Sequence, residues 1–121
     1  MDKIRVFITD DSPVARNILK RMLNDEEDIE VVGEAGTAGG SITALDETNP
    51  DVILLESAIG GDMGVPLLMR SIKDIKPYIR IILCVGVNAA EDMIKGAEPW
   101  TSDIIRKPYN KTSLLRAVRN I

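Results

Sequence analysis

The chain has 121 residues, of which 45% are hydrophobic and 28% charged, and its formal net charge is −4. These values are ordinary for a single globular domain with one core. The lysines and arginines form no long basic run, which argues against direct binding to nucleic acid. The sequence has no histidine, which excludes histidine-based catalysis and histidine-ligated metal.

The single cysteine, Cys84, lies inside an apolar run, which excludes a disulfide scaffold and fits a reducing compartment. No apolar stretch approaches the roughly 18 residues of a membrane-spanning helix, and the N-terminus has no signal-peptide pattern. The sequence therefore predicts a cytoplasmic protein without membrane contact.

The first half of the chain predicts two strands, each followed by a helix. Residues 4–9 are largely apolar, and Ser12 and the proline after it suit the start of a helix over 13–24. Residues 29–35 predict a second strand and residues 37–48 a second helix. Apolar residues that recur at helical spacing in the first helix, and should face the core, are Val14, Ile18, Leu19, Met22 and Leu23.

The third strand, residues 51–56, is the element around which the chain is organised. Its four consecutive aliphatic residues predict a central strand of a parallel sheet, buried on both faces. Glu56 ends this strand, and open α/β sheets bind ligands beyond the carboxyl ends of their strands. Glu56 is therefore the candidate centre of function. A glycine-rich turn at residues 60–64 and a helix over 65–75 follow.

The second half repeats the alternation. Residues 80–85 predict a strand that is apolar on both faces, followed by a helix that Asn88 caps and Pro99 breaks. Residues 103–106 predict a short fifth strand, and Asn110 caps the last helix. The apolar face of that helix comprises Leu114, Leu115, Val118 and Ile121.

Alternating strands and helices predict parallel strands with right-handed crossovers. We expect a flavodoxin-like, doubly wound (βα)5 fold with strand order 2-1-3-4-5. Residues 1–121 read as one domain, without a linker and without an output domain.

This strand order brings charged residues to one rim of the sheet. Asp10 and Asp11 follow the first strand, Glu56 ends the third, and Lys107 follows the fifth. Clustered carboxylates repel one another unless cations are present. Lys107 supplies one positive charge, and a hard, oxygen-binding ion such as Mg²⁺ would supply more.

These residues resemble the receiver domain of two-component response regulators, over essentially the whole chain. The matching stretches are Val6-Phe7-Ile8-Thr9-Asp10-Asp11-Ser12, Pro50-Asp51-Val52-Ile53-Leu54-Leu55 and Lys107-Pro108. Each stretch alone is weak, but together at this spacing they form a specific signature. The overall pattern is similar to a stand-alone, single-domain receiver of the chemotaxis type.

The resemblance implies a role for each rim residue. It assigns Asp11 as a direct Mg²⁺ ligand, Asp10 as its acidic neighbour, and the backbone carbonyl of Ala58 as a further ligand. Lys107 matches the lysine that pairs with a phosphoryl group. Glu56, which also lies within reach of the metal, stands where the family has the aspartate that accepts phosphate from a histidine kinase.

Three departures from the family pattern affect one switch. The acceptor is a glutamate, Val85 replaces the hydroxyl residue that ends strand four, and Ile104 replaces the aromatic switch residue. Glu56 is one methylene longer than aspartate and is expected to reach toward Lys107. Because a misplacement of about 1 Å can cost about a hundredfold in rate, these changes predict a degenerate phosphorylation site.

The sequence is thus interpreted as an atypical, non-enzymatic receiver that acts by binding a protein partner, either a histidine kinase or a downstream signalling protein. The expected surface is the face of the fourth helix, fifth strand and fifth helix, where Trp100, Ile104 and Tyr109 cluster by sequence. Alternatives are a conventional phosphoaccepting receiver, a Mg²⁺-dependent phosphotransfer enzyme, and, less favoured, a flavodoxin-type cofactor binder.

Overall fold

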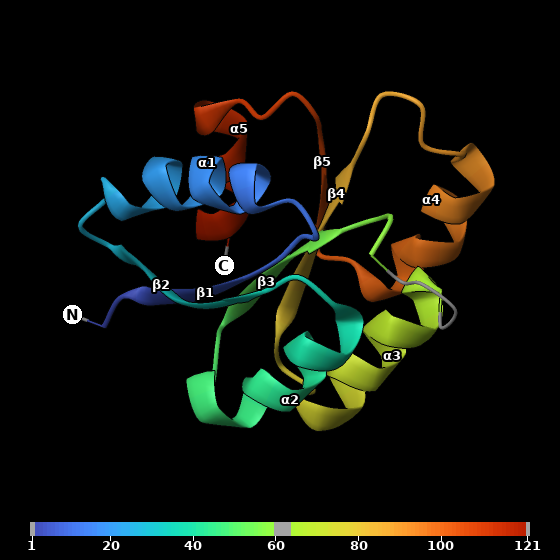
Figure 1. Ribbon diagram of the computed structural model, residues 1–121, viewed down its shortest axis with the longest axis horizontal. Coiled ribbons are helices and arrows are strands. Elements are labelled where there is room, and N and C mark those ends of the chain that lie inside the picture. The colour runs from blue at the N-terminus through green and yellow to red at the C-terminus, as the bar shows by residue number, and fades with distance from the viewer. Residues whose placement is uncertain (1, 60–63, 121) are drawn as a thin grey trace.

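The computed structural model describes residues 2–59 and 64–120 (Figure 1). The strands are β1 (Ile4–Thr9), β2 (Ile29–Ala35), β3 (Val52–Glu56), β4 (Arg80–Val85) and β5 (Asp103–Arg106). The helices are α1 (Pro13–Asn24), α2 (Ala38–Thr48), α3 (Val65–Ile75), α4 (Glu91–Ala97) and α5 (Lys111–Arg119), with a 3₁₀ turn, η1, at Glu98–Trp100.

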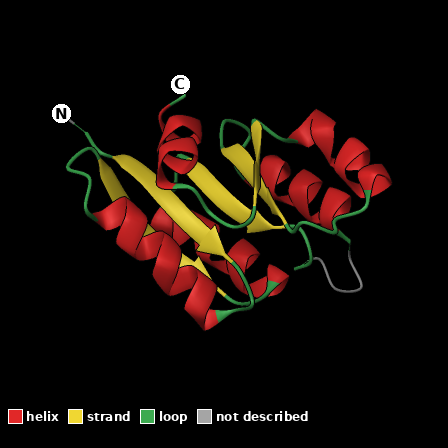
Figure 2. Cartoon of the chain, turned by 90° about the horizontal axis from the view of Figure 1, so that it is seen from above, coloured by secondary structure: helices red, strands yellow, loops and turns green. Residues whose placement is uncertain are grey.

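The strands form one parallel sheet in the order β2-β1-β3-β4-β5, which confirms the predicted flavodoxin-like topology. Helices α1 and α5 cover one face of the sheet, and α2, α3 and α4 cover the other (Figures 1 and 2). The central strand β3 is buried along its whole length. Its residues alternate between the two faces, because successive strand side chains point to opposite sides. Ile53 and Leu55 therefore join the α2/α3/α4 core, and Val52 and Leu54 join the α1/α5 core.

Side-chain caps fix the starts of several helices, as predicted. The Ser12 hydroxyl accepts a hydrogen bond from the Ala15 amide at 3.2 Å, and the Asn110 side chain accepts one from the Ser113 amide at 3.0 Å. The prediction that Asn88 caps the fourth helix is wrong, because α4 begins at Glu91 with Ala90 as its N-cap. A turn that joins the Ala89 amide to the Gly86 carbonyl at 3.2 Å holds this segment outside the helix.

The expected inward face of α1 is partly wrong. Leu19 and Leu23 are buried, but Val14 is 68% exposed and Ile18 is 41% exposed. The helix turns Arg16 and Lys20 toward β2 instead, where both side chains bind Glu34 at 2.9 and 2.5 Å. This rotation leaves the two aliphatic side chains in solvent.

Two sequence expectations fall on residues that the structure does not describe. They are the turn predicted at residues 60–64, of which only Gly64 is described, and the place of Ile121 on the apolar face of the last helix. Within residues 2–59 and 64–120, no helix combines the length and apolar character needed to cross a membrane.

Candidate functional site

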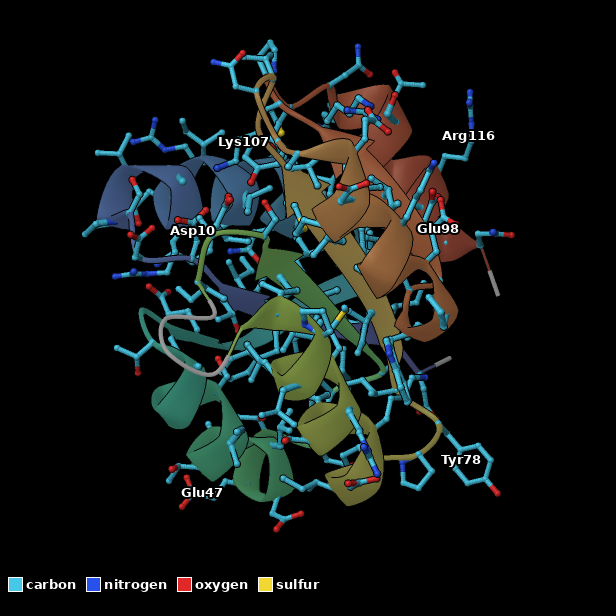
Figure 3. The ribbon with its side chains drawn as sticks, turned by 90° about the vertical axis from the view of Figure 1, so that its right-hand side faces the viewer. Asp10, Glu47, Tyr78, Glu98, Lys107 and Arg116 are labelled. Carbon is cyan, nitrogen blue, oxygen red and sulfur yellow. The ribbon has the colours of Figure 1, made fainter. Side chains whose placement is uncertain are left out.

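Three charged side chains meet at the carboxyl end of the sheet. The Lys107 ammonium forms an ion pair with Glu56 Oε2 and lies 3.8 Å from Asp10 Oδ2. Asp10 is 2% exposed and Glu56 is 7% exposed, so both acids are buried at the point where β1 and β3 end. Figure 3 places Asp10 and Lys107 at the same rim. The ion pair between Glu56 and Lys107 that the longer acid was expected to allow is thus present in the structure.

Burial and neighbouring charges shift the pKa values of Asp10 and Lys107 in opposite directions. Burial raises the pKa of the Asp10 carboxyl, although the Ser12 amide and the Lys107 charge oppose that rise. Burial alone would lower the pKa of Lys107, but the hydrogen bond and charge of Glu56 outweigh it and raise the pKa of the ammonium. Lys107 therefore stays protonated and offsets part of the negative charge of the two acids that face it.

The other oxygen of Glu56 is also engaged. Glu56 Oε1 accepts hydrogen bonds from the Ala58 amide at 3.3 Å and from the Ser57 hydroxyl at 3.4 Å. Asp10 Oδ1 accepts one from the Ser12 amide at 2.9 Å. Glu56 Oε2 is bound by the Lys107 ammonium, whereas the buried Asp10 Oδ2 has no hydrogen-bond partner within the described part of the chain.

The predicted metal ligands are only partly brought together. Asp10 and Glu56 meet at Lys107, and Ala58 lies next to them through its amide contact with Glu56 Oε1, whereas the side chain of Asp11 is exposed. Among residues 2–59 and 64–120, no group of three acidic, histidine or cysteine side chains is arranged to hold a metal ion. The donors are nonetheless carboxylate and carbonyl oxygens, which suit Mg²⁺, and the buried Asp10 Oδ2 has an unused acceptor.

The two predicted switch positions lie in the α2/α3/α4 core. Val85 is fully buried and Ile104 is half-buried in the same cluster. The Val85 carbonyl accepts a hydrogen bond from the Lys107 amide at 2.9 Å, which ties the end of β4 to the lysine. Both side chains are purely apolar, so neither can donate a hydrogen bond toward Glu56.

The sequence analysis did not place Cys84 and Tyr109 at this site, where both lie on the α1/α5 side of the sheet. Cys84 lies beside Glu56 in the register of β3 and β4, and burial raises the pKa of its thiol to about 12. The Tyr109 ring lies 5.8 Å from the Lys107 ammonium, close enough for a cation–π contact. The period-two alternation of β4 could have placed Cys84, since it puts Cys84 and Val85 on opposite faces.

The expected cluster of Trp100, Ile104 and Tyr109 is wrong. Trp100 and Ile104 pack against the α2/α3/α4 core, whereas Tyr109 packs against the α1/α5 core. The sheet lies between them, because β5 carries Ile104 on one face and the chain then turns onto the other. Arg16 was also overlooked: its guanidinium donates to the Asp10 carbonyl at 2.6 Å and so fixes the start of the acidic loop.

A parallel five-stranded sheet with two acids and a lysine at its carboxyl rim is the arrangement of a receiver domain. The sequence matches the response regulator receiver domain over residues 6–119. The chain belongs to this family, which acts in two-component signalling and interacts with kinases and effectors.

Curated relatives are longer proteins. The chain is 33% identical, over its whole length, to protein-glutamate methylesterase/protein-glutamine glutaminase 1 of Caulobacter vibrioides, and covers 35% of that protein. It is 30% identical to the transcriptional regulatory protein BtsR of Escherichia coli, with 98% of this chain and 48% of that protein aligned. The chain thus spans half or less of these relatives.

Solved structures give the same fold. The response regulator domain of Thermotoga maritima CheB superposes with a TM-score of 0.83 at 25% identity, covering 98% of this chain and 95% of that one. The receiver domain of the putative response regulator NarL from Mycobacterium tuberculosis gives a TM-score of 0.88 at 23% identity, covering 99% and 96%.

Proposed function

We propose that this receiver domain has a degenerate phosphorylation site and signals by binding a protein partner rather than through an acyl phosphate on its third strand. One observation carries the proposal: the Glu56 carboxylate already forms an ion pair with Lys107. In the family that this chain resembles, the equivalent lysine pairs with the incoming phosphoryl group. Here the side chain of Glu56 occupies the lysine in its place.

Two further features support a site that does not accept a phosphoryl group on Glu56. Val85 offers no hydroxyl to a phosphoryl group, and one preorganised donor of this kind contributes about 100- to 1000-fold to a rate. Ile104 offers no ring to follow such a movement. A switch needs two states with different affinities for its ligand, and these substitutions remove contacts that would distinguish them.

The proposed partner surface is the exposed face of α4, β5 and α5. It mixes charges of both signs, because the acids Glu91 and Asp103 and the arginines Arg106 and Arg116 are all exposed. A protein with complementary charges suits this face better than nucleic acid does, since the face has no continuous basic patch. We propose a histidine kinase or a downstream signalling protein as the partner, a cytoplasmic location, and no enzymatic activity in these 121 residues.

The direct test is chemical labelling. The protein is incubated with acetyl phosphate and Mg²⁺, and intact mass and peptide mapping locate any phosphoryl group. We expect no hydroxylamine-sensitive acyl phosphate on Glu56, because Lys107 is occupied and Val85 cannot assist. A stoichiometric acyl phosphate mapped to Glu56 would identify a conventional phosphoaccepting receiver and refute the proposal.

A second expectation concerns magnesium. We propose that Asp10, Asp11 and the Ala58 carbonyl bind Mg²⁺ weakly, with Glu56 contributing less because Lys107 already neutralises it. Calorimetric titration should give a weak, saturable signal that Asp11→Ala abolishes and that Asp103→Ala, an exposed acid on β5, leaves unchanged. Micromolar affinity that survives Asp11→Ala would show that the ion binds elsewhere.

A further inference from the structure

A serine hydroxyl lies directly against the carboxylate at the centre of the site. Ser57 follows β3, and its Oγ donates to Glu56 Oε1 at 3.4 Å. Its backbone is fixed, because the Ser57 amide donates to the Cys84 carbonyl at 2.9 Å. A hydroxyl in reach of a held carboxylate is the arrangement of a nucleophile beside its general base.

The carboxylate is oriented for this role. Lys107 binds Glu56 Oε2, while the Ala58 amide at 3.3 Å holds Oε1 on the side of the serine. Glu56 is thereby prevented from turning its second oxygen toward an incoming group. The free acceptor capacity of Oε1 remains directed at the Ser57 hydroxyl, where it can receive a proton.

The hydroxyl also has open space beside it. A hollow of about 490 Å³ lies between the end of β3 and the segment that leads into α4. Its described walls include Glu56, Ser57 and Ala58 on one side and Gly86, Ala89 and Met93 on the other. Gly86 has open space where a β-carbon would stand, which leaves room for a phosphoryl donor next to Ser57.

Two other aliphatic hydroxyls near this rim, those of Ser12 and Thr9, have structural roles. Ser12 Oγ accepts the Ala15 amide at the start of α1, and Thr9 Oγ1 is buried against Ser41 Oγ at 2.6 Å. Ser57 is half-buried, and its hydroxyl donates to Glu56 rather than to a backbone group. Within the described residues it therefore combines partial exposure with a neighbouring carboxylate that can act as a base.

From this geometry we infer that Ser57 is a covalent phosphorylation site and that Glu56 is its general base. The inference rests on the proposed function, because Glu56 can act as a base only if it is not itself the acceptor. The donor would be a small acyl phosphate or a phosphohistidine. The product is a phosphoserine ester, which persists far longer than an acyl phosphate and would record a signal durably.

The reaction balances with the groups present. The Ser57 oxygen forms a bond to phosphorus as the bond from phosphorus to the donor oxygen or nitrogen breaks. The hydroxyl proton passes to Glu56 Oε1, and the donor departs as acetate or as histidine. Lys107 stays paired with Glu56 Oε2, which leaves Oε1 to receive the proton.

The experiment labels the intact chain with acetyl phosphate and reads each phosphoryl group by peptide mapping and by its stability in hydroxylamine. We expect a hydroxylamine-resistant group on Ser57 that Ser57→Ala abolishes and that Ser102→Ala, which alters an exposed serine before β5, retains. Glu56→Gln should slow labelling about a hundredfold or more, since general bases contribute about 10²- to 10⁴-fold. Circular dichroism checks that each variant is folded.

Glu56→Asp provides a second, independent readout. The shorter acid withdraws from both Ser57 and Lys107 and becomes able to accept the group, so the label should move to position 56 and become hydroxylamine-sensitive. Absence of any label on Ser57 in the unaltered chain would overturn this inference and leave the proposed function intact. An acyl phosphate on Glu56 would overturn both, and label on Ser57 that Glu56→Gln does not slow would overturn the role of the base.

Discussion

Replacing Glu56 with aspartate and Val85 with threonine in one variant is expected to produce a chain that forms an acyl phosphate on its third strand. The shorter acid releases Lys107, which then becomes available to the phosphoryl group. The threonine supplies a hydrogen-bond donor at the end of β4. Hydroxylamine-sensitive labelling should rise from undetectable to stoichiometric, as measured by intact mass after incubation with acetyl phosphate and Mg²⁺.

Two further variants separate the contribution of the shorter acid at position 56 from that of the hydroxyl at position 85. Glu56→Asp combined with Val85→Ala lacks the hydroxyl but keeps the shorter acid, and it should label about 100-fold more slowly than the threonine variant, as for loss of one preorganised donor. Val85→Thr alone should not label Glu56. Equal labelling of all three variants would mean that neither the ion pair nor the missing hydroxyl controls the site.

Replacing Lys107 with methionine is expected to lower the free energy of unfolding by about 3 kcal/mol, near the lower limit for breaking a buried ion pair. Glu56 and Asp10 would then be buried carboxylates without a neighbouring positive charge, although the Lys107 side chain is 32% exposed and water can partly replace it. Urea unfolding followed by circular dichroism measures the change.

Lys111→Met is the matched control for this substitution. Lys111 forms exposed ion pairs with Asp25 and Glu26 at 3.7 and 3.6 Å, which contribute about 0–1 kcal/mol. Glu56→Gln in the Lys107→Met background should recover much of the lost stability, because it removes the uncompensated charge. A loss no larger than that of Lys111→Met would indicate that the pair contributes nothing.

The pH dependence of this effect has a defined sign. The pKa of Lys107 is raised in the folded chain, so the stability it contributes is present below its ordinary value of 10.5 and is lost as the pH rises through the raised pKa. The pKa of Asp10 is raised by burial, so its ionisation opposes folding as the pH rises above 3.8. The difference between the original chain and Lys107→Met should therefore persist at neutral pH and shrink in strong alkali.

Much of the fold follows from local pattern. Alternation and the two-faced burial of β3 and β4 predict a parallel sheet with these strands in its interior, and both features are explicit in their aliphatic runs. Helix starts marked by Ser12 and Asn110 were predictable, because the capping hydrogen bond forms within a few residues. The prediction that Asn88 caps a helix was wrong, although asparagine suits a cap, because a turn over residues 86–89 keeps this segment outside the helix.

The site was predictable where topology alone decides it. Strand order brings Asp10, Glu56 and Lys107 to one rim, and the extra methylene of Glu56 accounts for its contact with the lysine. The exposure of Val14 was not predictable, since it depends on Arg16 and Lys20 turning to a glutamate on β2. The separation of Tyr109 from Ile104 depends on where the chain crosses the edge of the sheet, which residue type does not encode.

The central claim is that the ion pair between Glu56 and Lys107 holds the domain in one state. The most direct measurement is backbone chemical-shift mapping by NMR with Mg²⁺ alone and with Mg²⁺ plus beryllium fluoride, a mimic of the phosphoryl group. We predict changes confined to the neighbourhood of Asp10, Asp11 and Glu56, with residues 85–88 and 104–109 unaffected. Large coordinated shifts across both of those segments would contradict the account, because they would reveal a working two-state switch.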